Sequence, residues 1–131
     1  MASSRLAFEY FRSRPFIPVC ISIENRITEP FRALVDSGAD VNLFPAVIGL
    51  MAGIDVRRGE ARKVMGIGGV ELDTFYWKIN LAIISRRPEI FETGANFCFE
   101  QIFPVLGRKG FFDLYKKVGF SEKRGVVELV L

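Results

Sequence analysis

Three consecutive residues of this chain, a carboxylate, a hydroxyl and a glycine, are the ones best suited to chemistry. They are Asp36, Ser37 and Gly38, and they follow directly on the apolar run from Phe31 to Val35. A carboxylate beside apolar surface is costly to ionise unless it has partners, and acid–base catalysts are commonly built in such places. Gly38 tolerates backbone angles that other residues avoid, and it lets another chain approach closely. The pattern therefore marks Asp36 as a candidate acid–base group at the end of a strand.

The residue inventory excludes several other chemistries. The chain contains no His, which removes Ser-His-Asp catalysis, Cys-His catalysis and His-ligated zinc. Its two cysteines, Cys20 and Cys98, are too few for a thiolate zinc site. Both lie in apolar runs, so we expect buried free thiols, with one disulfide as the alternative. We therefore expect no metal site and no cofactor.

Length and composition indicate one folded domain over residues 1–131. Half of the residues are hydrophobic and the formal net charge is +3, which suits a single domain with its own core. Residues 1–15 are ambiguous, and we interpret them as an N-terminal arm that packs on the core or on a partner chain. The Lys and Arg doublets are scattered, which indicates a solvated surface and no nucleic-acid partner.

The apolar runs are too short for a membrane span. The longest, residues 43–54, is interrupted by Pro45, Gly49 and Gly53, and the start of the chain lacks the apolar run of a secretory signal. We expect no membrane partner and a soluble, cytoplasmic protein.

Alternating apolar residues predict the strands that must position these groups. The clearest alternation runs from Phe16 to Glu24, and Phe31 to Val35 is the returning strand that delivers Asp36. Further strands are expected at 74–84 and at 96–103, where Phe97, Phe99 and Phe103 would share a face, with a loop at 85–94 and a closing hairpin over 120–131. The fold class is therefore mainly β, a small closed barrel.

Two segments have helical spacing. Pro45 can begin a short helix that Gly53 would end, and we expect its apolar residues to pack in the core. Those residues are Leu43, Phe44, Val47, Leu50 and Met51. A second short helix is expected at 111–117.

A glycine-rich turn lies between two further strand-like runs, 61–65 and 70–74. Three of the four residues from Gly66 to Gly69 are Gly, which supplies the positive φ angles of a tight turn. The spacing fits no phosphate-binding loop. The remaining residue, Ile67, is apolar, which is expected of a tip that closes over something apolar.

Taken in order, three segments resemble the retropepsin-like aspartic proteases, the single-domain relatives of pepsin. Leu34 to Asp40 is similar to their catalytic turn, Met65 to Val70 to their flap tip, and Pro104 to Arg108 to the hydrophobic-hydrophobic-Gly-Arg segment before their C-terminal helix. The hairpin that reaches Leu131 is longer than the tail of viral members and resembles cellular ones more closely.

The resemblance implies an acid-protease fold with a flap hairpin and one or two short helices. It also implies a homodimeric aspartic endopeptidase, because each chain carries one Asp-Ser-Gly and the chemistry needs two carboxylates. Two close carboxylates share a proton, as in the aspartic proteases that serve as the standard example. The ionised Asp36 would activate a water, and the protonated one would bind the scissile carbonyl.

Supporting roles are implied at matching positions. Ser37 would hydrogen-bond across the dimer, and Gly38 and Ala39 would let the substrate main chain approach. Asp40 would lie beside the cleft and pair with Arg108. The hairpin tip, with Gly66, Ile67, Gly68 and Gly69, would close over an extended peptide.

Other interpretations stay open. Asp36 alone would be an ordinary turn aspartate, and Arg108 alone a surface cation. The chain could instead be a catalytically silent dimer that binds peptides or assembles partners. A small basic barrel that binds single-stranded nucleic acid would need exposed aromatics beside cations. Tyr76, Trp77 and Lys78 are the one candidate cluster, and alternation turns Trp77 inward.

Overall fold

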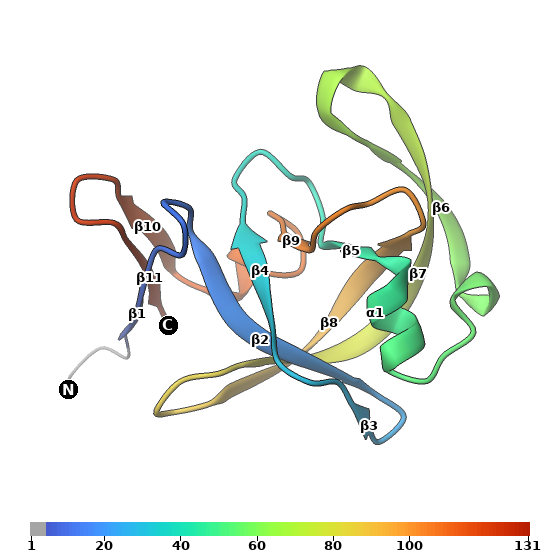
Figure 1. The fold of residues 1–131 in the computed structure, drawn as a ribbon, viewed down its shortest axis with the longest axis horizontal. Helices are drawn as coiled ribbons and strands as arrows, with labels where there is room; N and C mark the ends of the chain where they lie inside the picture. The colour runs from blue at the N-terminus through green and yellow to red at the C-terminus, as the bar shows by residue number, and fades with distance from the viewer. Residues whose placement is uncertain (1–4) are drawn as a thin grey trace.

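A closed ring of six strands forms the body of the structure, a computed structural model that describes residues 5–131 apart from the side chain of Ile67. Around the ring, each strand pairs with the next, and the last pairs with the first (Figure 1). In ring order the strands are β2 (Phe16–Ile23), β4 (Phe31–Val35), β9 (Val105–Leu106), β5 (Leu43–Pro45), β8 (Glu89–Cys98) and β7 (Glu71–Ile83). The predicted mainly β, barrel-like fold is confirmed.

Strand β2 shows why the sequence folds in this way. Its odd-numbered residues Ile17, Val19 and Ile21 are fully buried and Ile23 nearly so, while the residues between them are half-buried. This is the alternation that the sequence predicts for a strand with one face on the core. β2 pairs antiparallel with β4 on one side and with β7 on the other, so its apolar face becomes the centre of the barrel.

Two parallel pairings bring distant segments together. β4 pairs parallel with β9, with Leu34 opposite Val105, and β5 pairs parallel with β8. Because parallel strands end at the same edge, the turn after β4 lies beside the turn after β9. These turns carry two of the three motifs found in the sequence.

A long hairpin extends beyond the barrel at the upper right of Figure 1. It consists of β6 (Glu60–Met65) and the first residues of β7, joined by a 3-10 turn at Ile67–Gly69. Strand β8 pairs with β7 only from Phe75 onward, so residues 71–74 of β7 pair with β6 alone. The predicted glycine-turn hairpin is therefore present.

The two ends of the described chain meet in a second sheet. β1 (Arg5–Glu9) pairs with β11 (Val126–Val130), which also pairs with β10 (Lys117–Ser121). Of the arm expected at residues 1–15, β1 therefore joins a sheet of its own chain. The closing hairpin expected at 120–131 is confirmed, and it begins earlier, at Lys117. Val127 and Leu129 are fully buried and belong to the same core cluster as β2.

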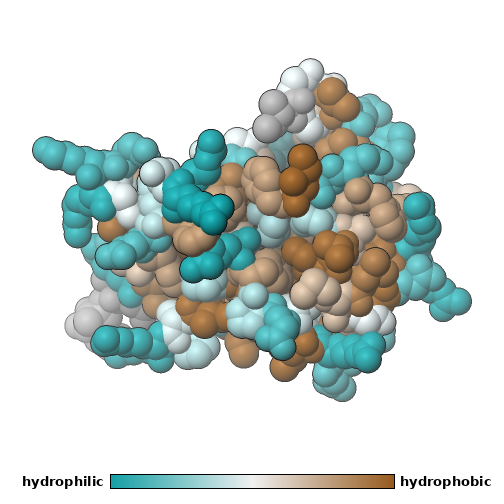
Figure 2. Space-filling model, in the orientation of Figure 1, coloured by the Kyte–Doolittle hydropathy of each residue, from teal (hydrophilic) through white to brown (hydrophobic). Residues whose placement is uncertain are grey.

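The helix α1 (Ala46–Met51) follows Pro45 as predicted, and Gly53 ends it with a φ of 81°. The expected core packing is confirmed for Leu43 and Phe44 and wrong for Val47, Leu50 and Met51, which are exposed. The residues that α1 buries instead are Ala46, Ile48 and Gly49. In Figure 2, hydrophobic side chains gather on the right of the view, where Figure 1 draws α1. The helix is too short to bury a whole apolar stripe, and Leu43 and Phe44 belong to β5 instead.

Other boundaries differ from the prediction. β8 begins at Glu89 because its first residues complete a ladder with the long β7, so the loop expected at 85–94 is much shorter. The same strand ends at Cys98, which leaves Phe99 and Phe103 outside it and about half exposed. The helix expected at 111–117 is only a 3-10 turn, Phe112–Leu114, because the backbone is already extended at Tyr115 and β10 begins at Lys117.

Short connections complete the fold. β3 (Arg26–Ile27) forms a hairpin with the end of β2, and a 3-10 turn at Val56–Arg58 precedes β6. The Trp77 indole N–H donates to the Val56 carbonyl at 3.0 Å, and the side chain is half-buried, consistent with its inward prediction. Cys98 is buried, Cys20 is half-buried, and both are free thiols.

Candidate active site

Asp36 is the first residue after β4, and main-chain hydrogen bonds hold it from both sides. Its N–H donates to the Leu106 carbonyl at 3.0 Å, which ties the turn to β9. The preceding residue, Val35, donates its N–H to the Pro15 carbonyl at 2.9 Å. The backbone that carries the carboxylate is therefore fixed by two neighbouring segments rather than by the turn alone.

The Asp-Ser-Gly turn also holds the carboxylate itself. The Gly38 N–H donates to Asp36 Oδ1 at 2.9 Å, and the Ala39 N–H donates to the Asp36 carbonyl at 3.1 Å. Asp36 is half-buried, whereas Ser37 and Gly38 are exposed. The bond from Gly38 is the sole side-chain hydrogen bond of Asp36 within residues 5–131, so Oδ2 remains available to a further donor.

The turn after β9 lies directly against the turn after β4. The Arg108 N–H donates to the Ala39 carbonyl, and the Lys109 N–H donates to the Asp40 carbonyl, both at 2.9 Å. Val41 and Lys109 form an isolated parallel bridge. The structure thus brings together the Leu34–Asp40 and Pro104–Arg108 motifs, which are far apart in the sequence.

An open pocket of about 700 Å³ lies beside this junction. Its lining comprises Ser37, Asp40, Val41, Arg108, Lys109, Phe112 and Asp113. Asp40 and Arg108 share the pocket, but the ion pair expected between them is not formed within 4.0 Å in the described chain; their segments are joined through the main chain instead. Both side chains are exposed, so both remain available to a ligand or a partner chain.

A buried asparagine that the sequence analysis did not identify stabilises the junction. Asn42 is fully buried; its Oδ1 accepts the Gly107 N–H at 2.9 Å, and its Nδ2 donates to the Gly94 carbonyl at 3.0 Å. The Asn42 carbonyl accepts both the main-chain N–H and Nδ2 of Asn96, at 2.9 and 3.2 Å. A polar residue amid Val41, Leu43 and Phe44 is the sequence signal that could have identified it.

The same polar network reaches the hairpin. The Thr74 hydroxyl is buried, lies 3.4 Å from Asn96 Oδ1 and donates to the Arg62 carbonyl of β6 at 2.7 Å. A chain of buried polar groups therefore runs from Gly107 through Asn42 and Asn96 to the base of the hairpin. Such networks are costly to break, because each lost partner leaves a buried polar group unsatisfied.

The tip of the hairpin requires its glycines. Gly68 and Gly69 both have a φ of 79°, where other residues are strained, and the Gly66 N–H donates to the Val70 carbonyl at 2.6 Å. The predicted closure by Ile67 falls on a side chain outside the described part of the structure. Further down the hairpin, Leu72 packs on the apolar cluster that contains Leu43, Cys98 and Val105.

That cluster is buried, and the partly buried Leu34 and Ala39 also pack against it. Ala39 follows the Asp-Ser-Gly turn, so a residue beside the candidate site and Leu72 of the hairpin pack against the same cluster. Burial raises the pKa of the Cys98 thiol, which favours the neutral thiol as an apolar packing group.

Within the described residues, no three His, Cys, Asp or Glu side chains gather as metal ligands. The described helices include none with the length and hydrophobicity to cross a membrane.

A comparison with solved structures agrees with this architecture, whereas two comparisons of the sequence found no match. No family model matches the chain, and no curated protein matches its sequence. A crystal structure of a retropepsin-like aspartic protease from Rickettsia conorii superposes with a TM-score of 0.66 at 10% sequence identity. The match covers 98% of this chain and 92% of that one.

The chain has a retropepsin-like fold. The family resemblance predicted from three short motifs is thereby confirmed at the level of the fold. In this retropepsin-like fold, the Asp-Ser-Gly turn and the Gly-Arg segment lie side by side, and the glycine-tipped hairpin extends from the same barrel.

Proposed function

We propose that the chain is an aspartic endopeptidase that hydrolyses peptide bonds as a homodimer. One observation supports the proposal most strongly, the placement of Asp36 in a retropepsin-like fold. Asp36 follows β4 and is half-buried; its N–H donates to the Leu106 carbonyl, and its Oδ1 accepts the Gly38 N–H. The carboxylate is oriented by the backbone and keeps one oxygen for another partner. This is the preorganisation that an acid–base catalyst requires.

The second carboxylate comes from the second chain. Each chain has one Asp-Ser-Gly, and a two-fold axis near Ser37 and Gly38, both exposed in the single chain, would bring two Asp36 side chains together. Two such carboxylates hold one proton between them. The ionised group takes a proton from water, and the protonated group donates to the carbonyl oxygen as the tetrahedral intermediate forms. This mechanism needs neither a covalent intermediate nor a metal.

The substrate is an extended polypeptide. Leu72 of the hairpin and Ala39 are partly exposed and pack on the same buried cluster, and the exposed Ile102 and Phe103 lead into the Pro104 carbonyl, which accepts the Leu34 N–H at 2.9 Å. These surfaces offer apolar contacts to alternate side chains of a peptide that binds as a strand. Asp40 and Arg108, exposed at the edge of the cleft, contact the peptide main chain.

The test is cleavage of an unstructured protein such as casein, measured from acid to neutral pH. We expect the wild type to cleave best below neutral pH, Asp36→Asn to be inactive, and the exposed Asp55→Asn to retain wild-type activity. Sedimentation should show a dimer for all three proteins. Equal cleavage by wild type and Asp36→Asn would exclude the mechanism, and a dimer without cleavage would favour the peptide-binding alternative.

A further inference from the structure

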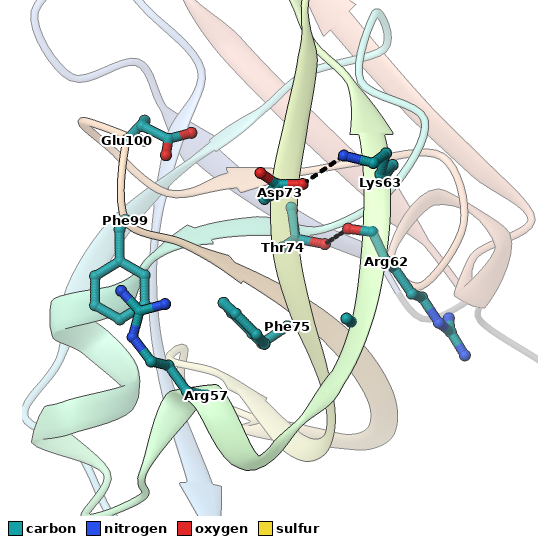
Figure 3. A pocket seen from close by; sticks show the side chains of 9 residues that line it. Arg57, Arg62, Lys63, Asp73, Thr74, Phe75, Phe99 and Glu100 are labelled. Atoms are coloured by element: carbon teal, nitrogen blue, oxygen red, sulfur yellow. Dashed lines mark hydrogen bonds and ion pairs between the residues drawn. The ribbon is translucent and has the colours of Figure 1, made fainter.

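A second pocket, of about 420 Å³, lies at the base of the hairpin (Figure 3). Side chains alternate along β7, so Asp73 and Phe75 face away from Leu72, which packs toward the candidate site. On β6, Ala61 and Lys63 are opposite Phe75 and Asp73 and lie on that same outer face. Apart from Arg62 and Thr74, the hairpin residues that line the pocket therefore lie on the face opposite the one that packs toward the candidate site.

Two aromatic rings form the apolar part of this pocket. Phe75 and Phe99 meet edge to face, with centroids 6.3 Å apart and an interplanar angle of 84°. Phe99 remains 47% exposed although it is a large apolar side chain. The two rings come from different segments, because β8 ends at Cys98 and the chain then turns away from β7.

A guanidinium lies over these rings. The Arg57 Cζ atom is 4.3 Å from the Phe99 centroid and 5.7 Å from the Phe75 centroid. No carboxylate of residues 5–131 lies within 4.0 Å of it, whereas the neighbouring Arg58 pairs with Asp55 at 3.9 Å. A guanidinium stacked on a ring keeps its planar edge of donors free for a carboxylate.

The other charged groups of the pocket are already engaged. Lys63 Nζ binds Asp73 Oδ1 at 2.7 Å, and Glu100 Oε2 accepts the Cys98 thiol at 3.7 Å. Figure 3 shows Glu100 at the end of the pocket opposite Arg57. Arg62 also lines the pocket, but its guanidinium pairs with Glu60 at 2.8 Å. The formal charges of the remaining lining residues, Arg57, Lys63, Asp73 and Glu100, cancel, so selectivity for an anion must come from the position of Arg57.

We propose that this pocket binds a carboxylate attached close to an aromatic ring. The ring would pack against Phe75 and Phe99, and the carboxylate would take the free edge of the Arg57 guanidinium. A peptide that ends in Phe or Tyr presents this chemistry, and so does a free aryl acid. The site is separate from Asp36, so binding requires neither catalysis nor the dimer.

The test is an NMR titration of the full isotope-labelled chain with N-acetyl-L-phenylalanine, next to N-acetyl-L-phenylalaninamide, which lacks the charge. We expect saturable shifts of the Lys63, Phe75 and Phe99 amides, and binding of the amide weaker by about tenfold, as for the loss of a charged hydrogen bond. Phenylpropanoate, which lacks the peptide group, distinguishes a free aryl acid from a peptide end as the ligand. Binding comparable to that of N-acetyl-L-phenylalanine indicates a site for aryl acids, and weaker binding indicates a site that also contacts the peptide group. Equal affinity for the acid and the amide would overturn the proposal.

Variants locate the site. Arg57→Ala should weaken binding of the acid about tenfold, and Arg57→Lys should be intermediate because it keeps the charge without the planar donors. Arg58→Ala, the matched control, should bind as the wild type does. Phe99→Leu, which keeps the apolar volume, should weaken acid and amide alike. If Arg58→Ala weakens binding as much as Arg57→Ala, or if the pocket amides do not shift up to the solubility limit, the site is excluded.

Discussion

Gly107 lies directly against the main chain of Val41. A Cβ atom at position 107 would come within 2.5 Å of the Val41 carbonyl carbon and 2.7 Å of its nitrogen. The two segments are close because β9 pairs with β4 and the Leu106 carbonyl accepts the Asp36 N–H, which brings Gly107 against the loop that follows Asp36. The glycine of the Gly-Arg segment is therefore a steric requirement for the close crossing that positions the candidate catalytic residue.

Gly107→Ala should disturb this crossing. The new methyl group would meet backbone, which cannot rotate away, so we expect a loss of about 3 kcal/mol or more in the free energy of unfolding. Gly119→Ala is the control, because its nearest atom is the Lys117 Cε at 3.7 Å, an ordinary contact. Urea unfolding measures both, and similar stability of the two variants would contradict the steric explanation.

Asn42→Ala should cost both stability and activity. It leaves the buried Gly107 N–H without its partner, at about 1–3 kcal/mol, and removes the bond to the part-buried Gly94 carbonyl, which costs less. Asn80→Ala, an exposed asparagine of β7, should be close to neutral. Because Asn42 positions Asp36 indirectly, we expect kcat to fall more than KM rises; a stable Asn42→Ala with normal kcat would show that the network does not position the carboxylate.

Much of the architecture could be predicted from local patterns. The alternation in β2, the strand before Asp36 and the glycine-tipped hairpin are each encoded by neighbouring residues, and the structure contains all three. The mainly β barrel followed from the many predicted strands, and its retropepsin-like character from the order of three short motifs. The catalytic roles of Asp36, Ser37, Gly38 and the hairpin are proposals, because they depend on a second chain and a substrate, which local sequence patterns do not encode.

The mispredicted elements depend on contacts between distant segments. The first half of β8 is a strand because β7 is long enough to pair with it, and Ile90 within it is 68% exposed. The role of Asn42 was not predicted, because it depends on Gly94 and Gly107, which are remote in sequence. The exposed face of α1 was predicted as core because helical periodicity does not say which face is covered.

Tyr115 offers a test of core energetics. Its hydroxyl is buried without a hydrogen-bond partner in the described chain, and burial, with the nearby charge of Glu89, raises its pKa. Tyr115→Phe should therefore be neutral or stabilising by up to about 1 kcal/mol near neutral pH.

The pH dependence of this substitution follows from the sign of the pKa shift. Above about pH 10 an unfolded tyrosine ionises while the buried one stays protonated, so the wild type loses stability as pH rises and Tyr115→Phe lacks that loss. We expect urea unfolding at about pH 8 and about pH 10.5 to show that the free energy of unfolding of Tyr115→Phe, relative to wild type, is larger at the higher pH. If this difference in the free energy of unfolding stays constant or changes in the opposite direction, the hydroxyl does not stay buried and protonated in the folded protein.

The hairpin tip should affect activity more than stability. Gly68 has a φ of 79°, and a Cβ there would meet no atom within 4 Å, so Gly68→Ala adds backbone strain without a clash. We expect a loss of about 1 kcal/mol in the hairpin conformation, a higher KM for peptide, and little change in the global unfolding midpoint. Unchanged KM would argue that the tip does not contact substrate.

The claim that each chain supplies half of an active site is tested most directly by mixing subunits. Wild type and Asp36→Asn are refolded together in equal amounts, and the activity per wild-type chain is compared with that of wild type refolded alone. An equal mixture of wild type and Arg58→Ala is the control. If every site needs two Asp36 carboxylates, only about a quarter of the random dimers are active, so activity per wild-type chain falls to about half that of wild type alone. In the control mixture every dimer is active, so activity per wild-type chain rises about twofold. Activity per wild-type chain that stays unchanged in the presence of Asp36→Asn would contradict the shared site.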